Sequence, residues 1–224
     1  MDELFNRVRQ EIEKKINLTP ITLPEELARV KLPLGLMDMH CYNFKGERVR
    51  KIYFMRFKAI PSLDVFGAAI YPEPVFDLPV FVCDLSCTKK KVFTYINFVV
   101  LFNDPSYLKK YIEPMKPVFE KYRQFPPHKA RDWMKPYLAP YSIYSMPEKN
   151  SLNELRDCAI KYLNLYLNFL SQAEEIKDPS YRNAIEQAQK KYIHDLTTYD
   201  ASRKMLGRII GMERSERIFH KVVS

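Results

Sequence analysis

The sequence predicts an α+β fold, a three-layer α/β/α sandwich in which a central antiparallel sheet lies between helices. Strand-like apolar patterns gather between about residues 34 and 102, while helical patterns precede this stretch and fill the second half of the chain. The strands follow one another through short turns, which favours antiparallel pairing over helical crossovers. Several strands are almost continuously apolar, so both faces of the sheet need a cover of helices.

The first 33 residues predict one helix and then an irregular stretch. Met1–Ile16 is amphipathic, with Asp2 at the N-cap position and apolar residues at helical spacing at Leu4, Phe5, Val8, Ile12 and Ile16. The following stretch, 18–33, is broken by Pro20, Pro24 and Pro33. Residues 34–42 are expected to be a short strand or irregular.

The middle of the chain predicts the sheet. The expected strands are Arg48–Ala59, Leu63–Tyr71, Pro79–Asp84, Val92–Phe102 and, later, Tyr141–Ser145. Pro72 and Pro74 form a turn in front of the third of these strands, because each removes an N–H donor. Gly67, inside a strand, indicates a close backbone approach or a deliberately empty space.

The second half predicts helices. They are expected at Asp104–Tyr122, with interruptions at Pro114 and Pro117, and at Leu152–Ile176, Asp178–Leu196, Ser202–Ile210 and Ser215–Val222, the last two separated by Gly211. The length of 224 residues suits a single domain spanning 1–224, with room for a substantial core.

Composition excludes several functional classes. A chain with 46% hydrophobic and 28% charged residues is folded, and no apolar run approaches the ~18–20 residues of a membrane span. The acidic start argues against a transit peptide, so we expect a cytoplasmic protein. With only 5 glycines and no glycine-rich motif, a phosphate-binding loop is disfavoured. The 4 cysteines and 4 histidines show no metal-ligand spacing, so no metal site is expected.

The net charge of +9 points to an acidic partner, which includes nucleic acid, an anionic surface, an acidic protein or a ligand with carboxylates. Simple solubility is the alternative explanation.

Two aspartates stand out. Asp84 lies inside an apolar strand, where it is either exposed at the strand end, tied to backbone N–H groups, or buried with a raised pKa and a chemical task. Asp200 lies in a break between helices just before Ser202, and the position alone favours a helix cap.

The stretch Y-P-E-P-V-F-D-L-P-V-F-V-C-D-L, residues 71–85, resembles the signature of the ferredoxin-dependent bilin reductases, the family of phycocyanobilin, phycoerythrobilin and phytochromobilin synthases. Arg50-Lys51, the segment 123–127 (R-Q-F-P-P) and the tail around 200–203 and 214–219 agree in order. The resemblance covers about residues 45–224.

This resemblance implies a three-layer sandwich with a linear tetrapyrrole between the sheet and the C-terminal helices. Members reduce biliverdin, which carries two propionates, with single electrons from an acidic [2Fe-2S] ferredoxin. They bind no flavin, metal or nicotinamide. We accordingly expect a monomeric enzyme with a two-electron reaction, such as reduction of the C15=C16 bond or of the A-ring.

The resemblance also assigns residues. Asp84 matches the catalytic acid on the central strand, and Asp200 matches the second aspartate of phycoerythrobilin- and phytochromobilin-type members. Arg123 matches an arginine that binds one propionate, and Arg203 and Lys204 are candidates for the other.

Three further residues are predicted to contact the pigment: Tyr53, Met55 and Gly67. Met55 replaces the glutamate that phycocyanobilin synthases need, which disfavours their four-electron reaction. Gly67 replaces the histidine or asparagine that lies beside the catalytic aspartate in characterised members, which leaves a gap for water or a turned substrate and leaves the choice of double bond open.

Two alternatives to the enzyme stay open from the sequence. The replacements at Met55 and Gly67 are also consistent with a non-catalytic tetrapyrrole carrier or sensor. A basic nucleic-acid-binding module, with aromatic residues such as Tyr107, Tyr111 and Tyr122 among the charges, ranks last, because tyrosines at helical spacing are more often core residues.

Overall fold

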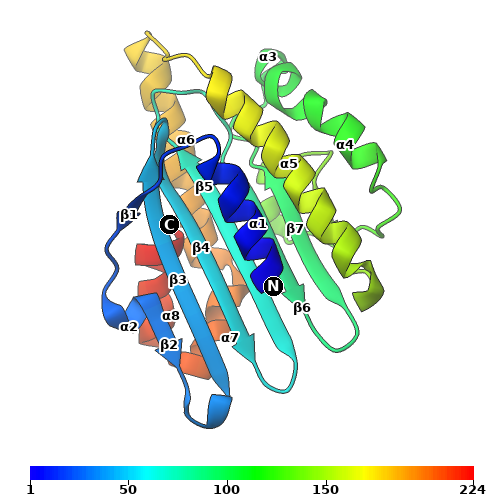
Figure 1. The fold of residues 1–224 in the computed structure, drawn as a ribbon. Helices are drawn as coiled ribbons and strands as arrows, with labels where there is room; N and C mark the ends of the chain where they lie inside the picture. The colour runs from blue at the N-terminus through cyan, green and yellow to red at the C-terminus, as the bar shows by residue number, and fades with distance from the viewer.

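The sheet runs through the centre of the molecule, between two layers of helices (Figure 1). The computed structural model describes residues 1–224. The strands are β1 Thr19–Ile21, β2 Arg29–Lys31, β3 Met37–Gly46, β4 Val49–Ala59, β5 Leu63–Pro72, β6 Phe81–Cys87, β7 Val92–Phe98 and β8 Ile143–Ser145. Their order is β1-β3-β4-β5-β6-β7-β8, with β2 also paired to β3, and every pair is antiparallel.

The helices precede, interrupt and follow this sheet. The α-helices are α1 Asp2–Glu13, α2 Glu25–Ala28, α3 Pro105–Tyr107, α4 Lys116–Glu120, α5 Leu152–Gln172, α6 Pro179–Tyr199, α7 Ala201–Ile210 and α8 Met212–Ile218. Shorter 3-10 or π-helical turns are η1 Pro33–Gly35, η2 Leu108–Ile112, η3 Glu113–Met115, η4 Asp132–Tyr137, η5 Lys149–Ser151 and η6 Phe219–Val223.

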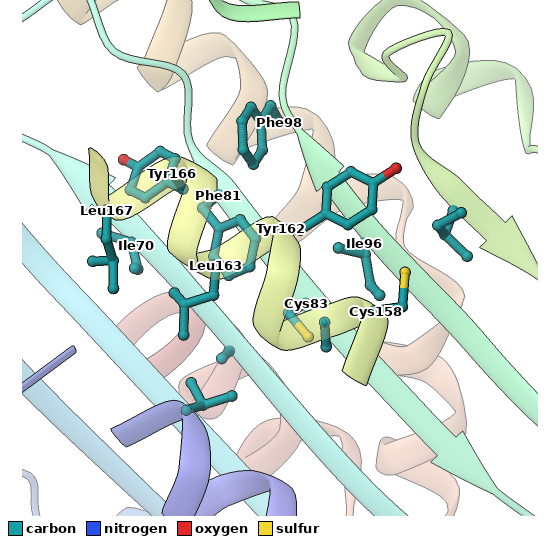
Figure 2. Packing of buried hydrophobic residues seen from close by; sticks show 14 of the residues in the cluster. Ile70, Phe81, Cys83, Ile96, Phe98, Cys158, Tyr162, Leu163, Tyr166 and Leu167 are labelled. Carbon is teal, nitrogen blue, oxygen red and sulfur yellow. The ribbon is translucent and has the colours of Figure 1, made fainter. Parts of the chain in front are cut away.

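Helices α1 and α5 cover one face of the sheet (Figure 1). On that face Phe81, Cys83 and Ile96 pack against Tyr162, Leu163 and Tyr166 of α5 (Figure 2). Tyr166 stays satisfied in this apolar layer because its hydroxyl donates to the carbonyl of Pro79 at 3.0 Å. This layer is therefore a densely packed core.

Helices α6 to α8 and the turn η6 cover the opposite face (Figure 1). Because side chains alternate along a strand, Val82 and Tyr95 point to this face, where they meet Tyr192, Leu206 and Phe219. Asp84, two positions after Val82, points the same way.

The α+β class and the antiparallel sheet between helices are confirmed, while several boundaries were wrong. The strand expected somewhere in 34–42 is β3, and the short strands β1 and β2 were missed. The apolar residues after Phe98, predicted as part of the strand, lie outside the sheet. The Val99 N–H donates a hydrogen bond to the Val80 carbonyl, and the Val100 N–H donates one to the Tyr137 carbonyl. These residues are apolar because they are buried, and not because they pair with a strand.

The predicted helices also changed at their ends. The expected helix 104–122 is split into α3, η2, η3 and α4, as the two prolines indicated. Helix α5 ends at Gln172, four residues before the predicted end. Helix α6 continues past Leu196, because the Thr197 hydroxyl donates to the Ile193 carbonyl at 2.9 Å and does not break the helix. Gly211, with φ of 90°, does separate α7 from α8.

Candidate functional site

Asp84 lies on β6, on the face of the sheet that helices α6 to α8 cover. It is paired with Gly67 of β5 and Tyr95 of β7 and is half-buried. The pKa of its carboxyl is raised to about 8, chiefly by burial and also by the charge of Asp200, while a backbone hydrogen bond from Ala68 opposes the rise. Asp84 is therefore largely protonated at neutral pH, although part of its surface stays open to a ligand.

Gly67 and Met55 lie next to this carboxyl. The two residues pair directly across β4 and β5. A Cβ atom placed on Gly67 would lie 2.8 Å from Asp84 Oδ1 and 3.8 Å from the Met55 methyl carbon. The carboxyl of Asp84 thus occupies the space that a side chain at position 67 would need, as the glycine in the strand predicted.

Four buried tyrosines surround Asp84 on the same face: Tyr53, Tyr71, Tyr95 and Tyr192. Burial raises the pKa of each hydroxyl, and the charge of Asp84 adds to the rise. These groups are neutral hydrogen-bond donors at physiological pH. The Tyr95 hydroxyl accepts a bond from Asn97 at 3.1 Å, whereas the buried Tyr71 hydroxyl has no partner.

Asp200 lies between α6 and α7 and caps α7. Its carboxylate accepts a hydrogen bond from the Ser202 N–H at 2.6 Å and another from the Ser202 hydroxyl. The cap expected from the sequence is confirmed. Asp200 is also close enough for its charge to raise the pKa of Asp84, so the end of α6 brings both aspartates to one region.

Arg203 and Lys204 follow this cap on α7 but differ in their surroundings. The Arg203 guanidinium donates to the Thr198 carbonyl and to Glu216, both at 3.3 Å, and its side chain is 18% exposed. It ties α6, α7 and α8 together. Lys204 is exposed and makes no ion pair, so its ammonium is free for a ligand.

Arg123 lies apart from these residues. Its side chain is 72% exposed and pairs with Glu120 at 3.0 Å. Its neighbours Tyr122 and Phe125 are buried in the core on the α5 side of the sheet. The structure therefore does not bring Arg123 to the face that carries Asp84.

Two surface hollows lie elsewhere. One of about 370 Å³ is lined by residues of η2, η4 and their neighbours, and another of about 570 Å³ by Arg48, Phe76 and glutamates including Glu73 and Glu175. Neither is lined by Asp84. No group of three or more His, Cys, Asp or Glu side chains is placed to hold a metal ion, and no helix is long and apolar enough to cross a membrane.

Sequence reasoning missed most of the tyrosines around Asp84. Tyr95 could have been found, because strand alternation and the hairpin turn at 88–91 place it opposite Asp84. Tyr192 could not, because nothing in the helical pattern of α6 specifies which sheet residue it meets.

Comparison with known proteins decides the family. The sequence model of the family described as ferredoxin-dependent bilin reductase matches residues 5–223. The chain belongs to this family. The phycoerythrobilin:ferredoxin oxidoreductase of Gloeobacter violaceus is 28% identical to this bilin reductase over 98% of the chain and 92% of the relative. That of Nostoc punctiforme is 30% identical over 80% of the chain and 72% of the relative.

A second enzyme type and a solved structure agree. The 15,16-dihydrobiliverdin:ferredoxin oxidoreductase of Nostoc punctiforme is 28% identical over 81% of the chain and 75% of the relative. The crystal structure of phytochromobilin synthase from tomato in complex with biliverdin matches 97% of this chain and 80% of that one, with a TM-score of 0.90 and 18% identity. That likeness confirms the fold of this reductase, and the relatives of the two types leave its bond specificity open.

Proposed function

We propose that this bilin reductase, acting as a single domain of residues 1–224, reduces biliverdin with electrons from a [2Fe-2S] ferredoxin. The observation that carries the proposal is the Asp84 carboxyl, half-buried on the face of the sheet below α6 to α8, with a pKa raised to about 8. A neutral carboxylic acid on such a face can donate a proton to a bound substrate. Only at higher pH does it lose that proton to solvent before the substrate binds.

Proton transfer from Asp84 makes electron uptake easier. An electron added to a conjugated tetrapyrrole creates negative charge, and a proton delivered with it cancels that charge in a site with little water. Reduction of one double bond takes two electrons, from two reduced ferredoxin molecules, and two protons. Two C–H bonds form, the C=C bond becomes a single bond, and both ferredoxins end oxidised.

Asp200 is the source of the second proton in this proposal. Its carboxyl group accepts hydrogen bonds from Ser202 at the start of α7, and its charge raises the pKa of Asp84. To donate the second proton, Asp200 first takes up a proton from solvent. Because the first transfer leaves Asp84 anionic, a second acid nearby avoids waiting for Asp84 to be reprotonated.

One of the two propionates is assigned to cations on α7. Lys204, which is exposed and unpaired, binds one propionate, and Arg203 reaches it by exchanging its bond to Glu216. Tyr53 and Met55 contact the pigment from β4, next to Asp84. Arg123 is not assigned to a propionate in this proposal, because its neighbours Tyr122 and Phe125 are buried on the other face of the sheet.

The test is anaerobic turnover. Purified protein is mixed with biliverdin and reduced ferredoxin, the visible spectrum is followed, and the product is identified by chromatography. We expect a two-electron product, either 15,16-dihydrobiliverdin or an A-ring-reduced bilin. Pigment that binds but stays unchanged over many equivalents of reductant would overturn the enzyme proposal and leave a carrier.

The Asp84→Asn variant tests the proton donor. Asparagine keeps the size of the side chain and removes the acidic proton, so we expect biliverdin binding within a fewfold of wild type. Turnover should fall on the order of 10²-fold or more, because a positioned general acid contributes at least that much. Unchanged turnover would remove Asp84 from the reaction.

A further inference from the structure

The Asp84 carboxyl leans sideways, over the neighbouring strand. Side chains directly opposite each other in an antiparallel pair have Cβ atoms about 4.5–5.5 Å apart. Asp84 Oδ1 lies only 2.8 Å from the point where a Cβ of Gly67 would be. The carboxyl is therefore directed across to β5 and lies over the backbone of Gly67.

Gly67 is needed for space and not for its backbone conformation. The two glycines with positive φ are Gly35 and Gly211, and Gly67 is in extended strand conformation, which any residue adopts. A glycine inside a strand destabilises the fold relative to alanine, because it has more backbone freedom to lose on folding. What the position gains in return is room for one carboxyl oxygen.

We propose that Gly67 is a positioning residue that lets the Asp84 carboxyl lie over β5 beside Met55, and thereby selects the part of the bilin that receives the first proton. The inference deepens the proposed function and rests on it. A donor over β5 reaches pigment atoms above β4 and β5, whereas an upright donor would reach atoms above β6. The difference is about one strand spacing, 4.7–4.9 Å, which is enough to reach a different bond of a linear tetrapyrrole.

No ionisable side chain around Asp84 holds its carboxyl over β5. The ionisable groups that face Asp84 are Tyr53 on β4, Tyr71 on β5, Tyr95 on β7, Tyr192 on α6 and Asp200 at the end of α6. No side chain of this set donates a hydrogen bond to Asp84. The one hydrogen bond to its carboxyl comes from the backbone of Ala68 on β5, next to Gly67. That bond draws the carboxyl toward β5, and the missing side chain at Gly67, beside Met55, leaves the room for it.

The direct test is Gly67→Ala. The clash is with the end of a side chain that can rotate, so the variant should fold and melt at or slightly above the wild-type temperature. The Asp84 carboxyl must move away from β5. Since a displacement of about 1 Å can cost on the order of 10²-fold in rate, we expect kcat to fall tenfold to a hundredfold with KM within twofold. We also expect a changed ratio of bilin products.

Two readouts separate positioning from a structural effect. The pH at which the rate falls should shift in Gly67→Ala, and so should the infrared C=O stretch of the protonated carboxyl, identified by its loss in Asp84→Asn. In the double variant Gly67→Ala with Asp84→Asn, the alanine should cause no additional loss, because its whole effect acts through Asp84.

Gly46→Ala is the matched control. Its Cβ would lie 2.4 Å from an Ile16 side-chain atom, far from Asp84 in the sheet, so this variant meets a clash of similar kind. It should lower the melting temperature but keep the product ratio and the pH profile. If wild type reduces biliverdin and Gly67→Ala matches it in kcat, product ratio and pH profile, the inference is wrong. If wild type does not reduce biliverdin, the proposed function fails instead.

Discussion

At the scale of single residues, Asp84 is an acid placed where its charge is costly. Burial raises its pKa from 3.8 in the unfolded chain to about 8 in the folded protein. The folded state therefore binds a proton more tightly than the unfolded state does between these two values. The same property that makes Asp84 a proton donor near neutral pH links the stability of the fold to pH.

This linkage has a definite sign. The stabilisation from protonated Asp84 is fully present below about pH 3.8 and is lost as the pH rises through about 8. Relative to wild type, Asp84→Asn should gain stability as the pH rises from 5 to 8.5. Each kcal/mol appears as roughly 2–4 °C in the melting temperature of a chain of this size.

Calorimetry or thermal denaturation at several pH values checks this prediction, with Asp77→Asn as a control that lies on the α5 side and bonds to Tyr111 and Lys110. A difference between wild type and Asp84→Asn that stays constant with pH would contradict a raised pKa at Asp84.

At the scale of elements, Asp200 combines two roles that substitutions can separate. Its side chain caps α7, and its charge acts on Asp84. Asparagine keeps a side-chain oxygen for the Ser202 N–H but has no charge and no acidic proton, whereas alanine loses all three.

We therefore expect Asp200→Asn to melt near the wild-type temperature and Asp200→Ala to be less stable by about 1 kcal/mol. Both variants should slow the second proton transfer, which accumulates a half-reduced radical that is visible by paramagnetic resonance. Equal turnover in wild type and Asp200→Asn would leave Asp200 as a helix cap alone.

The elements also show how far the sequence could lead. Alternation and proline positions were enough for the antiparallel sheet, for the two flanking layers and for the strand that carries Asp84. They failed where burial resembles a strand, as at Val99 and Val100, which are buried outside the sheet. Propensity cannot distinguish an apolar run that pairs from one that only packs.

The same limit applies to the prediction of the site residues. The place of Gly67 beside Asp84 came from the family resemblance, because the eight residues 73–80 between β5 and β6 are too many for turn geometry to fix the register. The contact of Arg203 with Glu216, and the position of Arg123 on the α5 side, depend on how distant helices dock. Such contacts are set by tertiary packing, and no local pattern encodes them.

At the scale of the whole molecule, the excess of positive charge favours an acidic electron donor. With a net charge of +9, encounter with an acidic ferredoxin is accelerated by long-range attraction, which salt screens over about 10 Å at 0.1 M.

We expect the rate of bilin reduction at limiting ferredoxin to fall at least tenfold between 50 and 500 mM salt. Reduction by a small uncharged reductant should change less than twofold over the same range, which controls for salt effects on bilin binding. Equal salt dependence with both reductants would show that the net charge plays no part in the encounter.

The two helical layers differ in construction, and the difference matters for a large flat substrate. Each face of the sheet carries one 21-residue helix, α5 on one side and α6 on the other, but α6 is followed on its face by the short pieces α7, α8 and η6, with Gly211 between α7 and α8. Segments of two or three turns can each tilt by a small amount without breaking a long continuous hydrogen-bond ladder. With the pigment on the α6–α8 side, as proposed, it can be admitted by small adjustments of α7, α8 and η6, while the opposite side keeps the strands, and with them Asp84, in register.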